Sequence, residues 1–183
     1  MAKRHYELHV AGCVRQLPIL NISDTLAIAG FVILGDTEIL VHTAKALAEK
    51  IPQDTDIILT AETKGIPLAA EMARVLGMKR YIVARKSVKA YMENPICVED
   101  ESITTKGKQL LYLSQDDVDL IQGKKVLLVD DVISTGGSMK AMKNLVEKAG
   151  AKVIGEAAIL AEGEAAKRKD IIFLEPLPLF DAE

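Results

Sequence analysis

The chain has 183 residues, of which 49% are hydrophobic and 27% charged, and its net charge is −3. This length and composition are typical of one globular domain with a full core. The negative balance argues against a general nucleic-acid-binding surface.

The N-terminal part of the chain predicts extended structure. Apolar and polar residues alternate over Tyr6–Val10, Ala11-Gly12 offers a turn, and Cys13–Leu20 extends again, which predicts a hairpin. The apolar run Leu26–Leu34 predicts another extended segment. That run is too short to span a bilayer. Because the N-terminus also lacks an apolar signal core, we expect a cytoplasmic protein.

Strand and helix patterns alternate along the rest of the chain. The predicted strands are Asp56–Thr60, Arg80–Ala84, Val126–Val129, Lys152–Leu160 and Ile171–Leu174. The predicted helices are Thr37–Lys50, Ile66–Leu76 and Gly136–Ala149. This alternation indicates parallel βαβ crossovers, so we expect an α/β fold with an open, mostly parallel sheet flanked by helices. Ligands bind such sheets outside the carboxyl ends of the strands.

A long irregular interval, Lys86–Gly123, separates the second and third of these strands. Within it, Gln109–Leu113 has an extended pattern. Loops of this length are usually functional or disordered. We therefore predict a hairpin flap over residues 86–114.

The most informative stretch is Val126–Ser138, with the sequence VLLVDDVISTGGS. Its apolar run predicts a strand buried on both faces, and the carboxylates of Asp130 and Asp131 follow at once. Small residues then lead into a helix. They are Ser134, Thr135, Gly136, Gly137 and Ser138.

The residue types of this stretch suit a sugar phosphate. Glycines let backbone N–H groups approach a ligand, and a helix start favours a phosphate. The loop hydroxyls donate to phosphate oxygens, whereas Asp130 and Asp131 only accept hydrogen bonds or hold a cation. Acceptors at one end and donors at the other fit a ribose 5-phosphate. The alternative is an acidic turn followed by an ordinary Ser/Thr helix cap.

Two further polar clusters follow predicted strands. Glu62–Gly65 offers N–H groups and the Lys64 ammonium, which would form a second anion site. A helix start with a surface lysine is the alternative there. Arg85-Lys86 ends the next strand, where a solvated charge cluster is the alternative. Because parallel strands end at one edge of a sheet, these loops are expected to converge with the acidic pair.

The stretch Val126–Ser138 resembles the phosphoribosyl pyrophosphate (PRPP) signature of the type I phosphoribosyltransferases. It is not a Walker A loop or a dinucleotide fingerprint, since neither Gly-Lys-Ser/Thr nor GxGxxG is present. The resemblance extends over roughly Asp56–Leu160. It implies a single domain over residues 1–183, with an N-terminal hood at 1–36 and a core at 37–175 that carries the flap.

The resemblance also implies roles for individual residues. Asp130 and Asp131 would hold the ribose hydroxyls and, through water, the cofactor Mg²⁺. The small-residue loop from Ser134 to Ser138 would bind the 5-phosphate. Thr63, Lys64 and Gly65 would bind pyrophosphate, together with the Arg85-Lys86 pair that opens the flexible loop.

Within the family, the loops at Lys64 and Arg85-Lys86 are similar to those of the adenine-type purine enzymes. Lys64 stands where those enzymes have an arginine. They also carry a flap glutamate proposed to act as acid or base at the purine, and Thr105 stands in its place here. Glu99 and Glu101 are the nearest candidates for that role, which makes Arg85, Lys86, Glu99 and Glu101 the predicted catalytic residues.

The expected function is therefore a purine phosphoribosyltransferase of purine salvage, acting as a homodimer on PRPP and a purine base. Adenine is narrowly favoured. The alternatives are a 6-oxopurine enzyme for hypoxanthine, guanine or xanthine, and a non-catalytic PRPP-binding regulator. In some purine members an aromatic residue near the C-terminus stacks on the base, which makes Phe173 a candidate, with core packing as its alternative.

Overall fold

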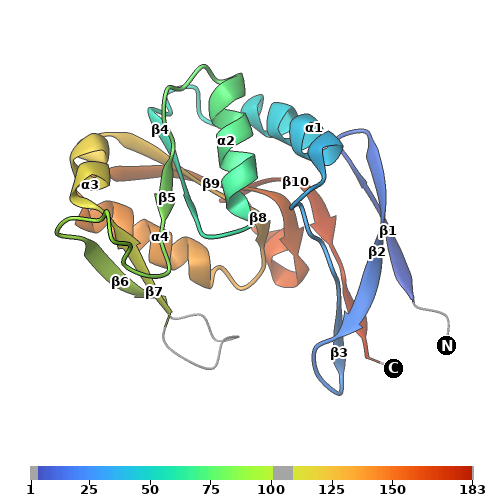
Figure 1. Ribbon diagram of the computed structural model, residues 1–183. Helices are drawn as coiled ribbons and strands as arrows, with labels where there is room; N and C mark the ends of the chain where they lie inside the picture. Colours follow the sequence, from blue (N-terminus) through green and yellow to red (C-terminus); the bar gives the residue numbers. More distant parts are fainter. Residues whose placement is uncertain (1–3, 101–108, 183) are drawn as a thin grey trace.

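A parallel sheet forms the centre of the computed structural model, which describes residues 4–100 and 109–182. The sheet has five strands in the order β10-β9-β8-β4-β5 (Figure 1). They are β4 (Ile57–Ala61), β5 (Ile82–Ala84), β8 (Lys125–Ile133), β9 (Lys152–Glu162) and β10 (Ile172–Leu177). The predicted α/β fold with an open parallel sheet is confirmed.

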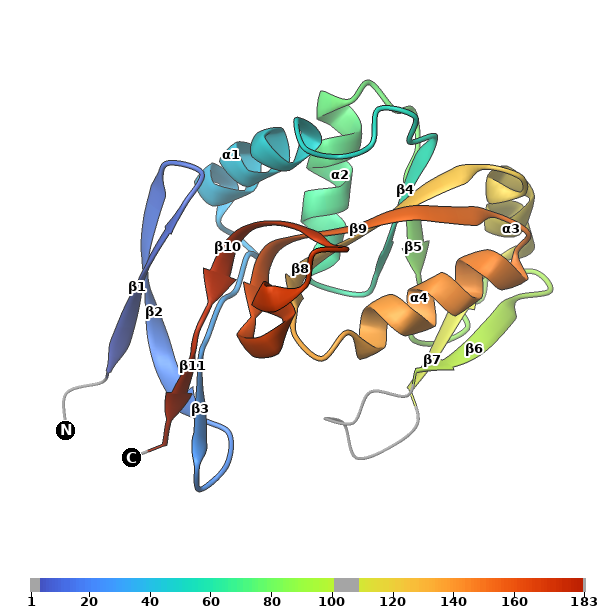
Figure 2. The same cartoon turned by 180° about the vertical axis from the view of Figure 1, so that it is seen from behind.

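Helices cover both faces of this sheet. The helices α1 (Thr37–Ala48) and α2 (Gly65–Val75) lie on one face, and α4 (Gly137–Lys148) lies on the other (Figures 1 and 2). Alternate residues of β8 accordingly enter two separate cores, with Leu127 facing α1 and α2 and Leu128 facing α4. Among the described residues, no helix is both long and apolar enough to cross a membrane.

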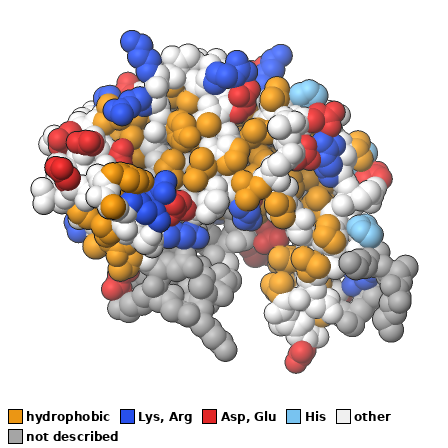
Figure 3. Space-filling model, viewed as in Figure 1, with side chains coloured by type: hydrophobic (Ala, Val, Ile, Leu, Met, Phe, Trp, Pro, Cys, Tyr) orange, Lys and Arg blue, Asp and Glu red, His pale blue; other side chains and the backbone are white. Residues whose placement is uncertain are grey.

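A four-stranded antiparallel sheet, which we call the hood, stands beside the parallel sheet. Its strands, in spatial order, are β1 (His5–Val10), β2 (Cys13–Asn21), β3 (Leu26–Ala29) and β11 (Leu179–Asp181). The predicted N-terminal hairpin is confirmed, with Ala11 and Gly12 at φ of 48° and 81° in its turn. In the space-filling view the hood projects at the lower right, and hydrophobic and charged side chains are interspersed over this face (Figure 3).

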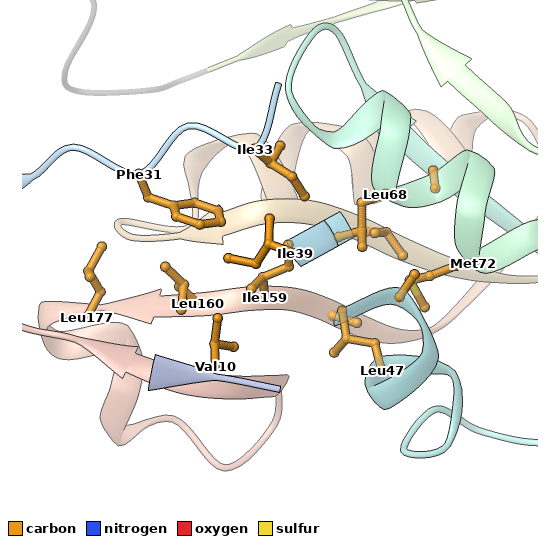
Figure 4. Packing of buried hydrophobic residues seen from close by; sticks show 14 of the residues in the cluster. Val10, Phe31, Ile33, Ile39, Leu47, Leu68, Met72, Ile159, Leu160 and Leu177 are labelled. Atoms are coloured by element: carbon orange, nitrogen blue, oxygen red, sulfur yellow. The ribbon is translucent and has the colours of Figure 1, made fainter. Parts of the chain in front are cut away.

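The hood differs from its predicted extent at both ends. It is not confined to residues 1–36, because β11 pairs with β3 and the Phe180 ring lies 5.7 Å from that of Tyr6. The extended segment predicted at Leu26–Leu34 is a strand only as far as Ala29. Beyond it, Phe31 and Ile33 turn into the core and pack near Val10 and strands β9 and β10 (Figure 4). This packing joins the hood to the parallel sheet.

The predicted flap is a hairpin, as expected. Strand β6 (Ile96–Asp100) pairs antiparallel with β7 (Gln109–Leu113). The backbone N–H of Tyr112 donates to the C=O of Arg85 at 2.8 Å, and the N–H of Arg85 donates to the C=O of Tyr112 at 2.9 Å. These two bonds attach the hairpin to the end of β5. Thr105 and Glu101 lie outside the described residues. The short helix α3 (Gln115–Ile121), capped by Ser114, was not predicted.

Two central strands are longer than their predicted lengths. The ladder between β8 and β9 continues past Val129, pairing Asp130 with Ala158 and Ile133 with Ala161. The acidic pair therefore lies inside a strand and not in a turn after it. Strand β9 reaches Glu162 by continuing its ladder with β10. The carboxyl-end rim is thus displaced by several residues from its predicted position.

Leu127 is fully buried in the central strand, so the Leu127→Ala variant should lose about 2–5 kcal/mol of unfolding free energy. The loss combines the lost transfer free energy with the cavity left behind. Urea unfolding measures it. Val75→Ala, at a side chain that is 39% exposed, is the control and should change stability by less than about 0.5 kcal/mol. Equal losses in both variants would contradict the two-core arrangement.

Candidate functional site

A cavity of about 330 Å³ lies at the carboxyl ends of the parallel strands, between them and the hood. A second cavity of about 100 Å³ adjoins it and shares with it Asp130, Val132, Ser134 and Ser138. The larger cavity is further lined by the hood segment from Ile28 to Phe31, by Ala61, Glu62, Thr63, Lys64, Lys86, Leu111, Asp131, Glu162 and Leu177. This is the rim at which a parallel sheet binds ligands.

The smaller cavity is formed by the predicted phosphate loop. Ser134, Thr135, Gly136, Gly137 and Ser138 all line it. Gly136 has a φ of 81°, which disfavours other residues, and it lets helix α4 begin at Gly137 without a side-chain cap. Within the described chain, the three hydroxyls have no hydrogen-bond partner that would compete with a ligand. Backbone N–H groups, hydroxyls and a helix start therefore surround a space suited to an anion.

The two adjacent carboxylates lie where both cavities meet. Asp130 lines both, and its Oδ1 accepts the N–H of Asp131 at 2.9 Å. Asp131 is only 3% exposed, and the Lys64 ammonium lies 3.1 Å from its Oδ2. Burial, and after it the charge of Asp131, raises the pKa of Asp130 to about 7. The negative charge of the two carboxylates is therefore only partly stabilised by the protein. A bound cation or a hydroxyl donor would stabilise it further.

Gly65 begins α2 in direct contact with this pair. A Cβ at this position would overlap Thr60 Oγ1 and lie 3.1 Å from Asp130 Oδ1. Thr60 is fully buried, and its hydroxyl has no partner in the described part of the chain. The sequence placed Gly65 in an anion-binding loop; the structure adds that only glycine permits the close approach of α2 to β8.

Glu62 connects the loop after β4 to the end of β5. Its Oε1 lies 2.9 Å from Arg85 Nε, and its Oε2 accepts the backbone N–H of Lys86 at 2.7 Å. The Lys86 ammonium lines the larger cavity, and no described residue pairs with it. Arg85 instead lines a separate cavity of about 280 Å³ with Tyr91. Of the predicted cationic pair, only Lys86 reaches the main cavity, and Arg85 supports Glu62 behind it.

Two further candidates, Glu99 and Phe173, do not line either cavity. Glu99 pairs with Leu110 in the flap and does not line either cavity. Glu101 lies outside the described residues. Phe173 packs against the α4 core, as its alternative reading held.

The sequence missed the apolar wall and one acid of the cavity. Ile28, Ala29, Phe31 and Leu177 form that wall, and no local pattern marks them because tertiary packing brings them together. Glu162 lines the cavity as the last residue of β9, two positions beyond the predicted end of that strand. Burial raises the pKa of Glu162, and the nearby Lys64 opposes that shift. A correct strand end would have identified Glu162 by the same rim argument.

The oxygen ligands present fit a magnesium ion held jointly with a substrate. Asp130 and Asp131 provide hard carboxylate oxygens at the cavity. Over residues 4–100 and 109–182, no group of three or more potential ligand side chains forms a metal cage. Mg²⁺ usually retains waters and uses one or two carboxylates with substrate phosphates, which matches this pair.

The raised pKa of Asp130 makes stability depend on pH. Between the unfolded value of 3.8 and about 7, the folded protein holds this proton more tightly than the unfolded chain does. Stability from this group is therefore lost as pH rises through that window. The unfolding free energy of Asp130→Asn, relative to wild type, should increase from about pH 5 to about pH 8.

Urea unfolding at several pH values measures this difference. Asp54→Asn is the control, because Lys125 lowers the pKa of this exposed carboxyl, and it should show no such increase. A difference for Asp130→Asn that does not change with pH would contradict the raised pKa.

Comparisons with known proteins all identify the same protein family. The Phosphoribosyl transferase domain matches residues 34–177. A hypoxanthine/guanine phosphoribosyltransferase of Methanothermococcus okinawensis is 36% identical over 130 residues, which cover 71% of this chain and 67% of that protein. An adenine phosphoribosyltransferase of Thermosipho africanus is 34% identical over 149 residues, covering 78% of this chain and 84% of that protein.

A solved structure has the same fold. The adenine phosphoribosyltransferase of Thermoanaerobacter pseudethanolicus superposes with a TM-score of 0.65 at 27% identity, covering 79% of this chain and 83% of that one. This structural similarity and the domain match indicate the same family as the PRPP signature that was predicted from the sequence. The chain belongs to the phosphoribosyltransferase family and has its type I fold.

Proposed function

We propose that this protein is a purine phosphoribosyltransferase that transfers the phosphoribosyl group of PRPP to N9 of a purine, releasing pyrophosphate. The observation that carries the proposal is a pair of adjoining cavities in which four kinds of surface meet. These are a phosphate loop, an acidic pair, the two lysines Lys64 and Lys86, and an apolar wall. Each corresponds to one part of the two substrates.

The chemistry of the loop and of β8 indicates where the 5-phosphate and the ribose of PRPP would bind. The hydroxyls and N–H groups between Ser134 and Ser138 donate to the 5-phosphate. Asp130 and Asp131 accept from the ribose 2- and 3-hydroxyls. They would also hold Mg²⁺ through its waters, and the bound ion would neutralise pyrophosphate charge. The close ion pair of Lys64 with Asp131 supports this, because the same carboxylate already attracts a cation.

In the reaction, the bond from C1′ to pyrophosphate oxygen breaks and its electron pair leaves with pyrophosphate. C1′ gains oxocarbenium character, and N9 of the base forms the new bond while the proton that the base loses passes to the departing pyrophosphate or to water. Lys64 and Lys86 would stabilise the departing charge as point charges, with Thr63 and Gly65 shaping the loop. Arg85 would act through Glu62, which holds the backbone of Lys86. The flap would exclude water.

The apolar wall supports a flat aromatic base. Ile28 comes from the hood strand β3, Phe31 from the segment after it, Leu177 from β10 and Val132 from β8. Adenine stays our narrow first choice, with 6-oxopurines as the alternative, since relatives of both names are similar to this chain. The acid role of Glu99 or Glu101 stays a prediction, as do the homodimer and the cytoplasmic location.

A base panel tests this function. Adenine, hypoxanthine, guanine, xanthine, orotate and uracil would each be supplied with Mg²⁺ and PRPP, and pyrophosphate release would be followed. We expect release with a purine and none with the pyrimidines. Release with 6-oxopurines alone would change the base but keep the mechanism. Tight PRPP binding without release for any base would favour a regulator.

The acidic pair should be specific for the sugar. Changing both Asp130 and Asp131 to Asn removes two charge-assisted acceptors, each contributing roughly tenfold to a hundredfold in affinity. Calorimetry should show a much larger loss for Mg²⁺-PRPP than for inorganic phosphate. The matched control changes the adjacent acids Asp116 and Asp117, outside both cavities, and should affect neither ligand. Equal losses for PRPP and phosphate would mean that the pair acts through the fold.

A further inference from the structure

Glu162 occupies the junction between the parallel sheet and the hood. It ends β9 and pairs with Leu177, which itself lines the cavity. A Cβ on the next residue, Gly163, would lie 2.8 Å from Leu179 of the hood strand β11. Glu162 lines the larger cavity together with Leu177 of its apolar wall, and it does not line the small cavity of the phosphate loop.

The other acids of the cavity already have partners. Glu62 holds Arg85 and the N–H of Lys86, Asp131 is paired with Lys64, and Asp130 accepts the N–H of Asp131. No hydrogen bond or ion pair from the described residues reaches the Glu162 carboxylate. Burial has removed part of its water, as its raised pKa indicates. A partly desolvated carboxylate without a donor is costly, so a ligand donor would be favoured there.

The chemistry of the base supplies such a donor. A carboxylate accepts hydrogen bonds and does not donate them. When N9 of a purine faces C1′, the six-membered ring extends away from the ribose site and toward the apolar wall. That ring carries N–H groups in the common bases, namely the 6-amino group of adenine, N1–H of hypoxanthine, and N1–H with the 2-amino group of guanine.

We propose that Glu162 is a specificity-determining residue whose carboxylate accepts a hydrogen bond from an N–H group on the six-membered ring of the purine. The inference rests on the proposed function and deepens it by naming the group that recognises the base. A site built to bind a donor rejects analogues that lack it, because its own polar group is then left unpaired. Unsubstituted purine, which has no N–H on that ring, is the matching probe.

The test compares Glu162→Gln with wild type, using adenine, guanine, hypoxanthine and unsubstituted purine at saturating Mg²⁺-PRPP. Loss of the charged acceptor should reduce kcat/KM by about tenfold to a hundredfold for the best donor-bearing base, mainly through KM. The value for unsubstituted purine should not fall. Calorimetry should give an unchanged Kd for PRPP.

Glu164→Gln is the matched control. Glu164 lies two residues further along, is largely exposed, and pairs with Lys167 outside the cavity, so its loss should not change base selection. If Glu162→Gln does not fold, Glu162→Asp carries the same test, because the shortened side chain withdraws its carboxylate from the base.

Two results would overturn the inference alone. Equal losses for every base, unsubstituted purine included, or a weakened PRPP affinity, would show that Glu162 acts through Lys64 on the pyrophosphate side. Absence of transfer by the wild type with every purine would overturn the proposed function and this inference together. The wild-type panel therefore separates the two failures.

Discussion

Two adjacent carboxylates at the end of a central strand are the constraint on which the site depends. Asp130 and Asp131 are held in β8 by a ladder that continues to Ile133, so they do not move into solvent. A buried charge requires a partner. Among the described residues, Asp131 pairs with the Lys64 ammonium, and Asp130 accepts the backbone N–H of Asp131. The raised pKa of Asp130 shows that the pairing is incomplete. Such an arrangement lowers the stability of the empty protein and favours a ligand that carries hydroxyl donors or a cation.

The parallel sheet and the hood are connected both by the chain and by a shared hydrophobic core. The chain passes from β10 in the parallel sheet directly into β11 of the hood, with Leu177 and Leu179 on either side of a single proline. Phe31, which also belongs to the wall, and Ile33 pack into the same core as β9 (Figure 4). The apolar wall is therefore fixed at both edges by the core that supports the acidic pair. Under the proposed function, the groups that select the base and those that bind the sugar would be supported by the same core.

The sequence pattern predicted those parts of the fold that are determined by residues close together in the chain. The alternation of strands and helices, the hairpin, and the strand–loop–helix at Val126–Ser138 followed from periodicity and small residues. The hood strand β11 and the wall residue Phe31 depend on long-range pairing, which one sequence does not encode locally. Asp130 was predicted to follow its strand because polar residues usually end an apolar run, whereas the ladder with β9 continues through it. The same error hid Glu162.

The cations of the site divide by how firmly they are held. Arg85 is fixed by Glu62 and by backbone bonds to Tyr112, whereas Lys64 makes one ion pair and Lys86 has a free ammonium among the described residues. A lysine is a compact charge on a flexible stem, so it exchanges partners at small geometric cost, while the planar guanidinium suits a fixed fork. Under the proposed function, a cation and ribose hydroxyls bound at Asp131 would release Lys64 toward the pyrophosphate. On this proposal, substrate binding would transfer the positive charge of Lys64 from Asp131 to the departing pyrophosphate.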